Sequence, residues 1–385
     1  MPREQWRAVR AIETCRTATL GGHVDQCDSC SHQRISYNSC RNRHCPKCQT
    51  LAKAKWLQAR MAELLQVPYF HIVFTVPREI ASVAFQNKKL VYTILFRAAS
   101  QTLLTIAADP KHLGAKIGFL AVLHTWTQTL LHHPHIHCVV PGGGLSLDHT
   151  RWVSSRKQFF LPVRVLSQVF RGKFLFYLKQ AFDQGKLKFF GDLEPLTDPK
   201  AFVSFLRKNR AIEWVVYAKP PFGGPAQVLD YLGRYTHRVA ISNNRLLAFQ
   251  DGNVTFQYKD RKNGNRKKSM TLDNHEFIRR FLIHILPQGF AKLRYFGFLA
   301  NRHRSDRLSL CRQLLQEPPL DDDPQILDWK SRHQTLTGES LEICPACRQG
   351  RMLLLQILVP LWKRHTNQKR RMRPQTTGQN LIHAP

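Results

Sequence analysis

Two histidines separated by one residue stand out in the stretch "LLHHPHIHCVVPGGGL", residues 130–145. Side chains of a β-strand alternate between its two faces, so His135 and His137 share a face and Ile136 points the other way, into a core. Two adjacent imidazoles can bind a divalent cation and leave positions open for substrate oxygens. A pair of hydrogen-bonded structural histidines is the alternative interpretation. His132 and His133 flank the pair in either case.

A pair of tyrosines lies about a hundred residues later, in "DYLGRYTHR". Tyr231 and Tyr235 are four residues apart on a predicted helix, so their hydroxyls share a face. They could be half-buried packing residues at the edge of that helix's apolar stripe. The basic residues near the two tyrosines in the sequence favour a site that binds a phosphate instead. These residues are Arg234, His237 and Arg238. A tyrosine hydroxyl has a pKa near ~10, so it needs a cation and nearby positive charge to act as a nucleophile.

The N-terminal cysteines have the spacing of zinc ligands. Two Cys-x-x-Cys pairs, Cys27 with Cys30 and Cys45 with Cys48, are separated by fourteen residues. One tight turn can present two thiolates, and zinc binds four such ligands in a tetrahedron. Clustered thiols without a metal are the alternative. A second site could be completed by Cys15, His23, Cys40 and His44. Basic residues in this segment suit contact with nucleic-acid phosphates; they include Arg34, Arg41, Arg43 and Lys47.

A further Cys-x-x-Cys pair, Cys344 and Cys347, lies near the C-terminus. It supplies only half of a zinc site. We considered His303 and Cys311 as the other half. The stretch that follows Cys347, "RQGRMLLLQIL", is predicted to form an apolar strand.

The charge balance points to a polyanionic partner. The 385 residues include 58 Lys and Arg against 26 Asp and Glu, a net charge of +32. Nucleic acid is the first candidate for neutralising such a surface, and an anionic membrane is the second. No run of 18 apolar residues exists, and the first residues contain no apolar signal segment. We therefore expect a cytoplasmic, nucleoid-associated protein whose cysteines bind metal and do not form disulfides.

The hydrophobic pattern places these residues on a mixture of strands and helices. Strands are predicted at 69–77, 117–127, 135–141, 214–219, 238–250 and 253–260, and helices at 49–65, 87–107, 163–185, 223–236 and 272–286. Because strict βαβ alternation is absent, the pattern predicts an α+β fold with a largely antiparallel sheet. The expected domains are a zinc-binding module at 1–50, a catalytic domain at 51–300, a basic C-terminal region at 301–365 and a disordered basic tail at 366–385.

The motifs "HPHIH", "YLGRY" and "SCRNRHCPKCQ" together resemble the HUH endonuclease superfamily. Within it the chain is similar to rolling-circle transposases of the insertion-sequence-91 family, the two-tyrosine type, over residues 11–299. The resemblance implies an antiparallel sheet flanked by helices, preceded by a small zinc-ribbon-like domain that recognises DNA. It also implies that His135 and His137 bind Mg²⁺ or Mn²⁺. Gln128 is the favoured third ligand, with His124 and His133 as the other candidates.

The resemblance further implies a covalent mechanism on single-stranded DNA. Tyr231 or Tyr235 would attack a phosphodiester at an element end, giving a 5′-phosphotyrosine link and a free 3′-hydroxyl. The other tyrosine would act in a later strand transfer to target DNA. Two alternatives remain open at this point. One is a plasmid replication initiator or relaxase with the same chemistry, and the other is a non-catalytic zinc-ribbon DNA-binding protein. No membrane and no small-molecule substrate are expected.

Overall fold

The computed structural model describes residues 1–156, 158–219, 227, 229, 233, 240–260, 263–319 and 328–361. The chain divides into two compact units. Unit 1 comprises Met1–Trp6 and Ala52–Ile326, and unit 2 comprises Arg7–Leu51 and Leu327–Pro385. Each unit is described by itself. The helix α1 (Arg3–Thr14) begins in unit 1 and continues into unit 2.

A five-stranded antiparallel sheet forms the centre of unit 1. Its strand order is β12-β4-β5-β3-β8. The strands are β3 (Tyr69–Thr75), β4 (Gly118–Trp126), β5 (His132–Pro141), β8 (Val216–Lys219) and β12 (Leu293–Gly297). Along β5, Ile136, Cys138 and Val140 are fully buried in the main core, whereas the residues between them point to the opposite face.

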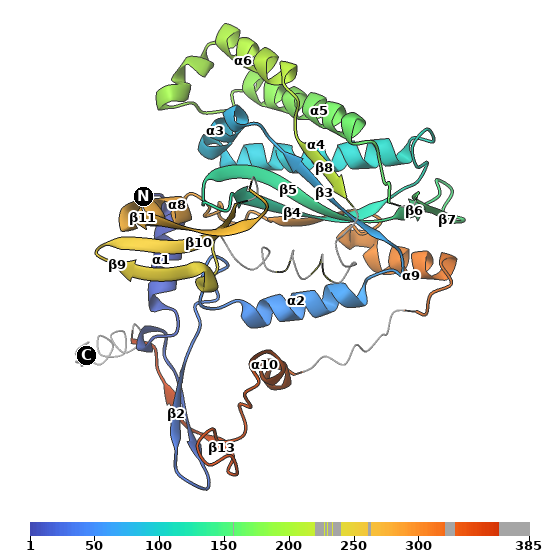
Figure 1. Ribbon diagram of the computed structural model, residues 1–385. Coiled ribbons are helices and arrows are strands. Elements are labelled where there is room, and N and C mark those ends of the chain that lie inside the picture. Colours follow the sequence, from blue (N-terminus) through green and yellow to red (C-terminus); the bar gives the residue numbers. More distant parts are fainter. Residues whose placement is uncertain are drawn as a thin grey trace, which may run out of the picture. The chain divides into compact units, whose positions relative to one another are not determined.

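Helices cover the face of this sheet that carries Ile136. They are α3 (Arg78–Gln86), α4 (Lys88–Ala108) and α5 (Val163–Asp183), with α6 (Pro199–Ala211) packed against α5, and Figure 1 shows α4 and α5 lying across the sheet. The core between them is rich in aromatic rings, such as Phe74 against Phe170 with centroids 4.9 Å apart. By length and composition α4 could cross a membrane, but 67% of its apolar window is buried in the protein, as in a core helix.

Unit 1 also contains a helix on the opposite face of the sheet and a second, smaller sheet. The helix α2 (Thr50–Ala62) packs Trp56 and Leu57 against sheet residues of that face. The smaller sheet has the order β11-β10-β9. Its strands are β9 (Leu246–Gln250), β10 (Asn253–Asp260) and β11 (Arg266–Asp273), followed by α8 (Asn274–Leu282). Asp273 caps α8 by accepting hydrogen bonds from the backbone N–H groups of His275 and Glu276.

Shorter elements complete the two units. In unit 1 these are the two-stranded sheet of β6 (Gly143–Leu145) and β7 (Trp152–Ser154), the 3-10 turns η2 (Gly191–Thr197), η3 (Asn243–Arg245) and η4 (Asn301–His303), and the helix α9 (Arg304–Leu314). In unit 2 the strands β1 (Gly22–Cys27), β2 (Gln33–Tyr37) and β13 (Met352–Leu358) form a sheet of order β13-β1-β2. The turn η1 (Ala18–Leu20) and the helix α10 (Trp329–Thr337) also belong to unit 2.

The expected α+β class with an antiparallel sheet flanked by helices is confirmed. Predicted helices at 87–107 and 163–185 correspond to α4 and α5. The strand predicted at 238–250 is shorter, because a 3-10 turn at Asn243–Arg245 precedes β9; paired asparagines favour such a turn. The helix predicted at 223–236 lies outside the described residues, apart from three isolated positions. Residues 301–365 were expected to form one region, whereas α9 falls in unit 1 and β13 in unit 2.

Candidate active site and metal centres

Three histidines converge on the face of the five-stranded sheet that is turned away from the main core. In the antiparallel pairing of β4 with β5, His124 lies directly opposite His135. Residues opposite each other on adjacent strands share a face, so His124 joins His135 and His137. One ligand nitrogen from each of the three rings lies within 4.8 Å of the others. We call these three residues the histidine group.

Hydrogen bonds orient two of the three rings. His135 Nδ1 lies 2.6 Å from the backbone carbonyl oxygen of His133. A carbonyl oxygen can only accept, so Nδ1 carries the proton and Nε2 is free of one. His137 Nδ1 lies 2.7 Å from Nε2 of His71 on β3. Partners of this kind, on the ring nitrogen that does not bind metal, commonly fix the orientation of metal-binding histidines.

His71 is a member of this site that the sequence analysis did not single out. Its ring stacks on that of His137, with centroids 4.9 Å apart and planes 10° apart. The signal was its position in a predicted strand, "YFHIVFTVP", that alternates in the same way as the strand of the pair. Its significance becomes visible only with the register of β3 on β5, which sets His71 diagonally beside His137.

Gln128, the favoured third ligand, is not in the histidine group, and His124 is. The regular pairing of β4 is interrupted between His124 and Trp126, so the chain leaves the sheet before Gln128. The Gln128 side-chain oxygen accepts a hydrogen bond from the Lys259 backbone N–H at 3.4 Å. Its carbonyl oxygen accepts one from Arg245 at 2.5 Å. His133, the remaining candidate, contributes its backbone carbonyl to His135.

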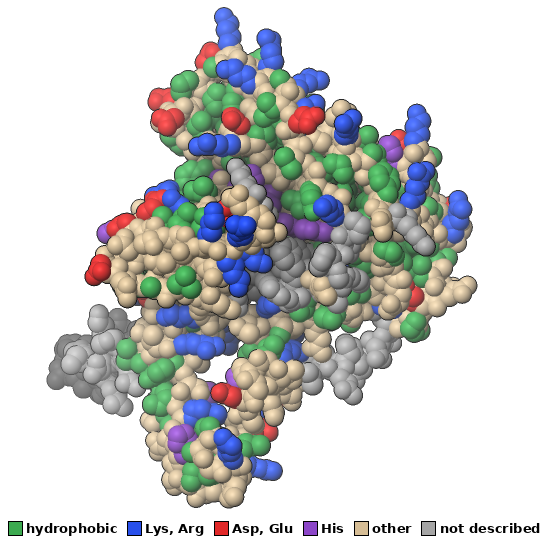
Figure 2. All heavy atoms as spheres, in the orientation of Figure 1, with side chains coloured by type: hydrophobic (Ala, Val, Ile, Leu, Met, Phe, Trp, Pro, Cys, Tyr) green, Lys and Arg blue, Asp and Glu red, His purple; other side chains and the backbone are tan. Residues whose placement is uncertain are grey.

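The histidine group is largely shielded from water. His124 is 3% exposed and His137 is 5% exposed, while His135 is half-buried. Trp126 stacks on His124 with centroids 5.1 Å apart. Figure 2 shows histidine side chains at the surface of unit 1, with Lys and Arg side chains beside them. Three imidazole nitrogens close to one another fit a divalent transition metal.

His132 has a different environment from the histidine group. Its Nε2 lies 2.8 Å from the Tyr92 hydroxyl oxygen, and burial lowers the pKa of His132 to about 3. A second buried histidine, His284, lies near it. Burial also lowers the pKa of His284 to about 4, and its ring nitrogens contact the Thr125 hydroxyl at 3.1 Å and the Leu130 carbonyl at 3.0 Å. Both rings are therefore neutral, structural groups at ordinary pH.

The predicted nucleophiles lie outside the described residues. These are Tyr231 and Tyr235, together with the basic residues expected around them, Arg234, His237 and Arg238. Leu229, two residues before Tyr231, is described and is 3% exposed. It packs in an apolar cluster with Val122 and Val139. Val122 lies opposite His137 on β4, and Val139 follows His137 by two residues on β5, so Leu229 packs on the face that carries the histidine group.

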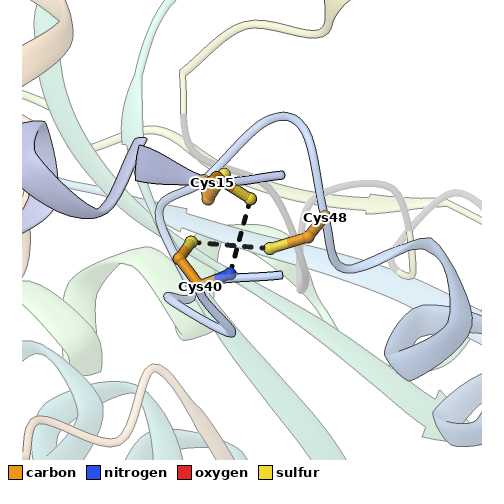
Figure 3. A group of neighbouring side chains, drawn as sticks. Cys15, Cys40 and Cys48 are labelled. Atoms are coloured by element: carbon orange, nitrogen blue, oxygen red, sulfur yellow. Dashed lines mark hydrogen bonds between the residues drawn. The ribbon is translucent and has the colours of Figure 1, made fainter. Parts of the chain in front are cut away.

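Four cysteines of the N-terminal segment form the first of two cysteine groups. The N-terminal cysteine group consists of Cys15, Cys40, Cys45 and Cys48, whose sulfur atoms all lie within 4.8 Å of one another. Figure 3 shows three of them facing a common centre. Cys40 Sγ and Cys48 Sγ are 3.7 Å apart, and the Cys40 backbone N–H donates to Cys15 Sγ at 3.5 Å.

The second group corrects the expectation that the two N-terminal Cys-x-x-Cys pairs share one zinc site. Cys27 and Cys30 do not share a site with Cys45 and Cys48; the structure places them with Cys344 and Cys347. We call these four residues the composite cysteine group. The physical reason is the antiparallel pairing of β1 with β13, in which Cys27 lies opposite Met352. Cys311, considered earlier as a partner of Cys344, is instead buried in an apolar cluster of unit 1.

The remaining predicted residues of the module have other surroundings. Among the described residues, neither cysteine group contains His23 or His44. His23 Nε2 lies 3.5 Å from Asp25, and the His44 backbone N–H donates to the Asn42 side chain. The residues expected to contact DNA in this module differ in exposure: Arg41 and Lys47 are exposed, and Arg43 is half-buried.

Comparison with known proteins places the chain among transposases with a zinc-binding domain. A family profile described as "Transposase zinc-binding domain" matches residues 1–76, and one described as "Putative transposase" matches residues 118–307. The chain is 59% identical over 355 residues to "Putative transposase y4qJ" of Sinorhizobium fredii, covering 92% of this chain and 89% of that protein. It is 29% identical over 306 residues to "Transposase for insertion sequence element IS801" of Pseudomonas savastanoi pv. phaseolicola, covering 76% and 70%. No solved structure matches the chain.

Proposed function

The chain belongs to the insertion-sequence-91 family of transposases, and from this premise we propose that it moves DNA by a rolling-circle mechanism. It cleaves single-stranded DNA at the ends of a mobile element and joins the released strand to a target. The catalytic domain corresponds to residues 51–300 and the DNA-recognition module begins within residues 1–50.

The observation that carries the proposal is the convergence of His124, His135 and His137 on one face of the sheet. Leu229 packs on the same face of the sheet as that group. In the sequence, Tyr231 follows Leu229 by two residues and Tyr235 follows it by six. We therefore assign these two residues as the nucleophiles that act at the histidine group.

The proposed reaction is a transesterification at phosphorus. The oxygen of one tyrosine forms a bond to the phosphorus atom, the bond from phosphorus to the 3′ oxygen breaks, and the tyrosine proton ends on that 3′ oxygen. The products are a 5′-phosphotyrosine link and a free 3′-hydroxyl. The second tyrosine acts in the later strand transfer. Arg234, His237 and Arg238 stabilise negative charge on the phosphoryl oxygens.

The histidine group would hold the catalytic cation through Nε2 of His135 and His137 and through one nitrogen of His124. A bound divalent cation polarises the phosphate and stabilises the charge that develops there. Imidazole donors suit transition metals better than Mg²⁺, which prefers oxygen ligands. We therefore propose Mn²⁺ as the better cofactor of the two, with His71 holding the His137 ring in the orientation that presents Nε2.

The zinc-binding module is proposed to hold the DNA. The net charge of +32 supports a polyanionic partner, and Arg41, Arg43 and Lys47 lie between or beside the cysteines of the N-terminal group. Contacts from such residues to phosphates are independent of base sequence and weaken as the salt concentration rises. The protein would accordingly act in the cytoplasm, on nucleoid DNA.

A covalent adduct with DNA tests the proposal directly. The full-length protein is incubated with labelled single-stranded DNA from a candidate element end and Mn²⁺, and the mixture is separated on a denaturing gel. We expect a labelled band at the position of protein plus DNA. The band should disappear when Tyr231 and Tyr235 are both changed to Phe.

A tyrosine remote from the histidine group provides the matched control. Tyr177→Phe removes a hydroxyl on α5, which packs on the opposite face of the sheet, where it contacts Gln101. This variant should form the adduct as the wild type does. An adduct that persists undiminished in the double Tyr231→Phe, Tyr235→Phe variant would exclude these residues as nucleophiles.

A further inference from the structure

The composite cysteine group lies only partly within the regions that the family profiles match. Its first two members, Cys27 and Cys30, fall within the zinc-binding match at residues 1–76. Its other two, Cys344 and Cys347, lie beyond both matched regions, 314 or more residues later in the chain. The site therefore takes half of its ligands from a segment to which neither family profile assigns a role.

The distances between the sulfur atoms suit a tetrahedral metal site. Cys27 Sγ and Cys347 Sγ are 3.7 Å apart, as are Cys30 Sγ and Cys344 Sγ, and all four lie within 4.8 Å of one another. Zinc–sulfur bonds of roughly 2.3 Å in a tetrahedron place the sulfurs roughly 3.8 Å apart. A disulfide would require a separation of roughly 2.05 Å. The arrangement therefore matches four thiolates around one ion.

The two halves of the site have the same backbone construction. Ser31 follows Cys30 with φ of 56°, and Arg348 follows Cys347 with φ of 58°. This left-handed conformation costs non-glycine residues roughly 1–2 kcal/mol. In each half a backbone N–H group also points at a sulfur atom: Ser29 donates to Cys27 Sγ and Gly350 donates to Cys347 Sγ, both at 3.4 Å.

Positive φ values recur next to both cysteine groups. Of the twelve non-glycine residues with positive φ among the described residues, five directly follow a cysteine of one of the groups; they are Arg16, Ser31, Arg41, Gln49 and Arg348. Strained conformations persist where the surrounding structure requires them. At Gly350 the fit is also steric, because a Cβ atom there would clash with Cys27 Sγ.

The strand β13, which directly follows the C-terminal half of the site, is held only weakly by packing. β13 is an edge strand, paired on one side with β1. Its side chains Leu353, Leu354, Leu355 and Ile357 are each more than half exposed. Burial of apolar surface therefore contributes little to keeping β13 in the sheet, and a backbone ladder along a single edge stabilises a strand only weakly.

From these observations we infer that Cys27, Cys30, Cys344 and Cys347 bind a structural zinc ion that fastens the C-terminal segment to the N-terminal module. With four protein ligands the site is closed, so the ion takes no part in chemistry. Metal binding supplies the folding energy that packing does not, as in small zinc domains. The inference is independent of the catalytic role proposed for the histidine group.

Metal content of the full-length protein tests the inference. The protein is purified with zinc, desalted and analysed by mass spectrometry of the metal, without DNA and without Mn²⁺. With a second ion in the N-terminal cysteine group, the wild type should hold two zinc ions per chain beyond any taken up by the histidine group, which a parallel His135→Ala, His137→Ala protein subtracts. The double variant Cys344→Ser, Cys347→Ser should hold one. Cys311→Ser, a buried cysteine outside both groups, should still hold two.

A second measurement separates loss of the ion from loss of the fold. Cys347→His keeps a zinc ligand, so this variant should retain two ions and show an altered spectrum when Co²⁺ replaces zinc. In the double serine variant, a protease should cut residues 341–361 at a lower dose than in the wild type, while residues 69–319 stay protected. The inference is overturned if the double serine variant holds as much zinc as the wild type. It is also overturned if the wild type holds a single ion and the double serine variant keeps that ion.

Discussion

The histidine group and the cysteine groups are held in place in opposite ways. In unit 1 the histidines sit on a sheet whose other face is packed with fully buried side chains such as Ile72, Phe74 and Ile136. In unit 2 the buried apolar side chains, among those the structure describes, are Ala8, Val24 and five of the cysteines. The fold thus positions the ligands in unit 1, whereas in unit 2 the ligands and their ions must hold the fold.

Removal of zinc should give the largest effect and should affect unit 2 selectively. Structural zinc contributes about 10–16 kcal/mol in small domains, which is comparable to the entire stability of a folded domain, about 5–15 kcal/mol. Treatment with a strong chelator should therefore unfold residues 7–51 and 328–361 while residues 69–319 remain folded. Limited proteolysis followed by mass spectrometry locates the cuts. If the protease cut both units equally after chelation, the two units would not differ in their dependence on zinc.

Loss of the histidine pair should have the reverse outcome, with activity lost and the fold kept. The variant His135→Ala, His137→Ala should reduce adduct formation with DNA by about 1000-fold, because a bound cation supplies several kcal/mol of charge stabilisation. The zinc content should not change. The control is His275→Ala, whose side chain is 90% exposed at the start of α8. A double variant that keeps full adduct formation would show that the group is structural.

Substitution of His71 should have a smaller effect, because His71 orients the His137 ring and does not itself bind the cation. The variant His71→Ala should weaken Mn²⁺ binding by about 10–100-fold, the usual cost of removing such a partner. His71→Gln should recover most of the affinity, since its amide oxygen can accept the hydrogen bond from His137 Nδ1. Titration followed by electron paramagnetic resonance measures the affinity. If His71→Ala and His71→Gln bind Mn²⁺ alike, the His71 ring does not act through this hydrogen bond.

The buried histidines of unit 1 should make its stability fall in mild acid. The pKa of His284 is lowered to about 4 and that of His132 to about 3, against about 6.5 for a free histidine. Between pH 6.5 and 4 the unfolded chain therefore binds more protons than the folded one. The contribution to stability is complete above pH 6.5 and is lost as the pH falls, by roughly 1.4 kcal/mol per pH unit for each histidine.

The slope of the melting temperature against pH tests this expectation. His284→Gln should flatten the slope between pH 6.5 and 4.5, whatever its effect on stability at neutral pH. The matched change at an exposed position, His275→Gln, should leave the slope as in the wild type. Parallel slopes in all three proteins would assign the acid sensitivity to other groups.

Local pattern was sufficient to predict that His135 and His137 share one face of a strand. His135 and His137 follow from the period of two along β5, and Ile136 is buried in the core as that alternation requires. The third member could not be chosen in this way. Gln128 is nearer in sequence to the pair than His124, but the register of β4 against β5 sets His124 opposite His135. The register depends on how two strands align with each other, and a single sequence does not reveal that alignment.

The cysteines illustrate the same limit over a longer distance. Two Cys-x-x-Cys pairs fourteen residues apart suggested one shared site. The sequence around such a pair is the same whether the two pairs form one site or each forms half of a different site. Cys40 and Cys15 complete one, and Cys344 and Cys347 complete the other. The segment "QGRMLLLQIL" was predicted to form a strand and does so as β13. Its partner β1 lies more than 300 residues earlier, and the pairing brings the two halves together.

The composite cysteine group has a consequence for the order of events during synthesis. Cys27 and Cys347 are 320 positions apart. At about 5–20 residues per second, roughly 16–64 s pass between the emergence of the first and the last ligand from the ribosome. Throughout that interval the nascent module has half of a binding site, and its sheet lacks an edge strand. The zinc-binding module of this transposase is therefore begun first and finished last, so a chain interrupted before Cys344 would carry the histidine group without a completed module.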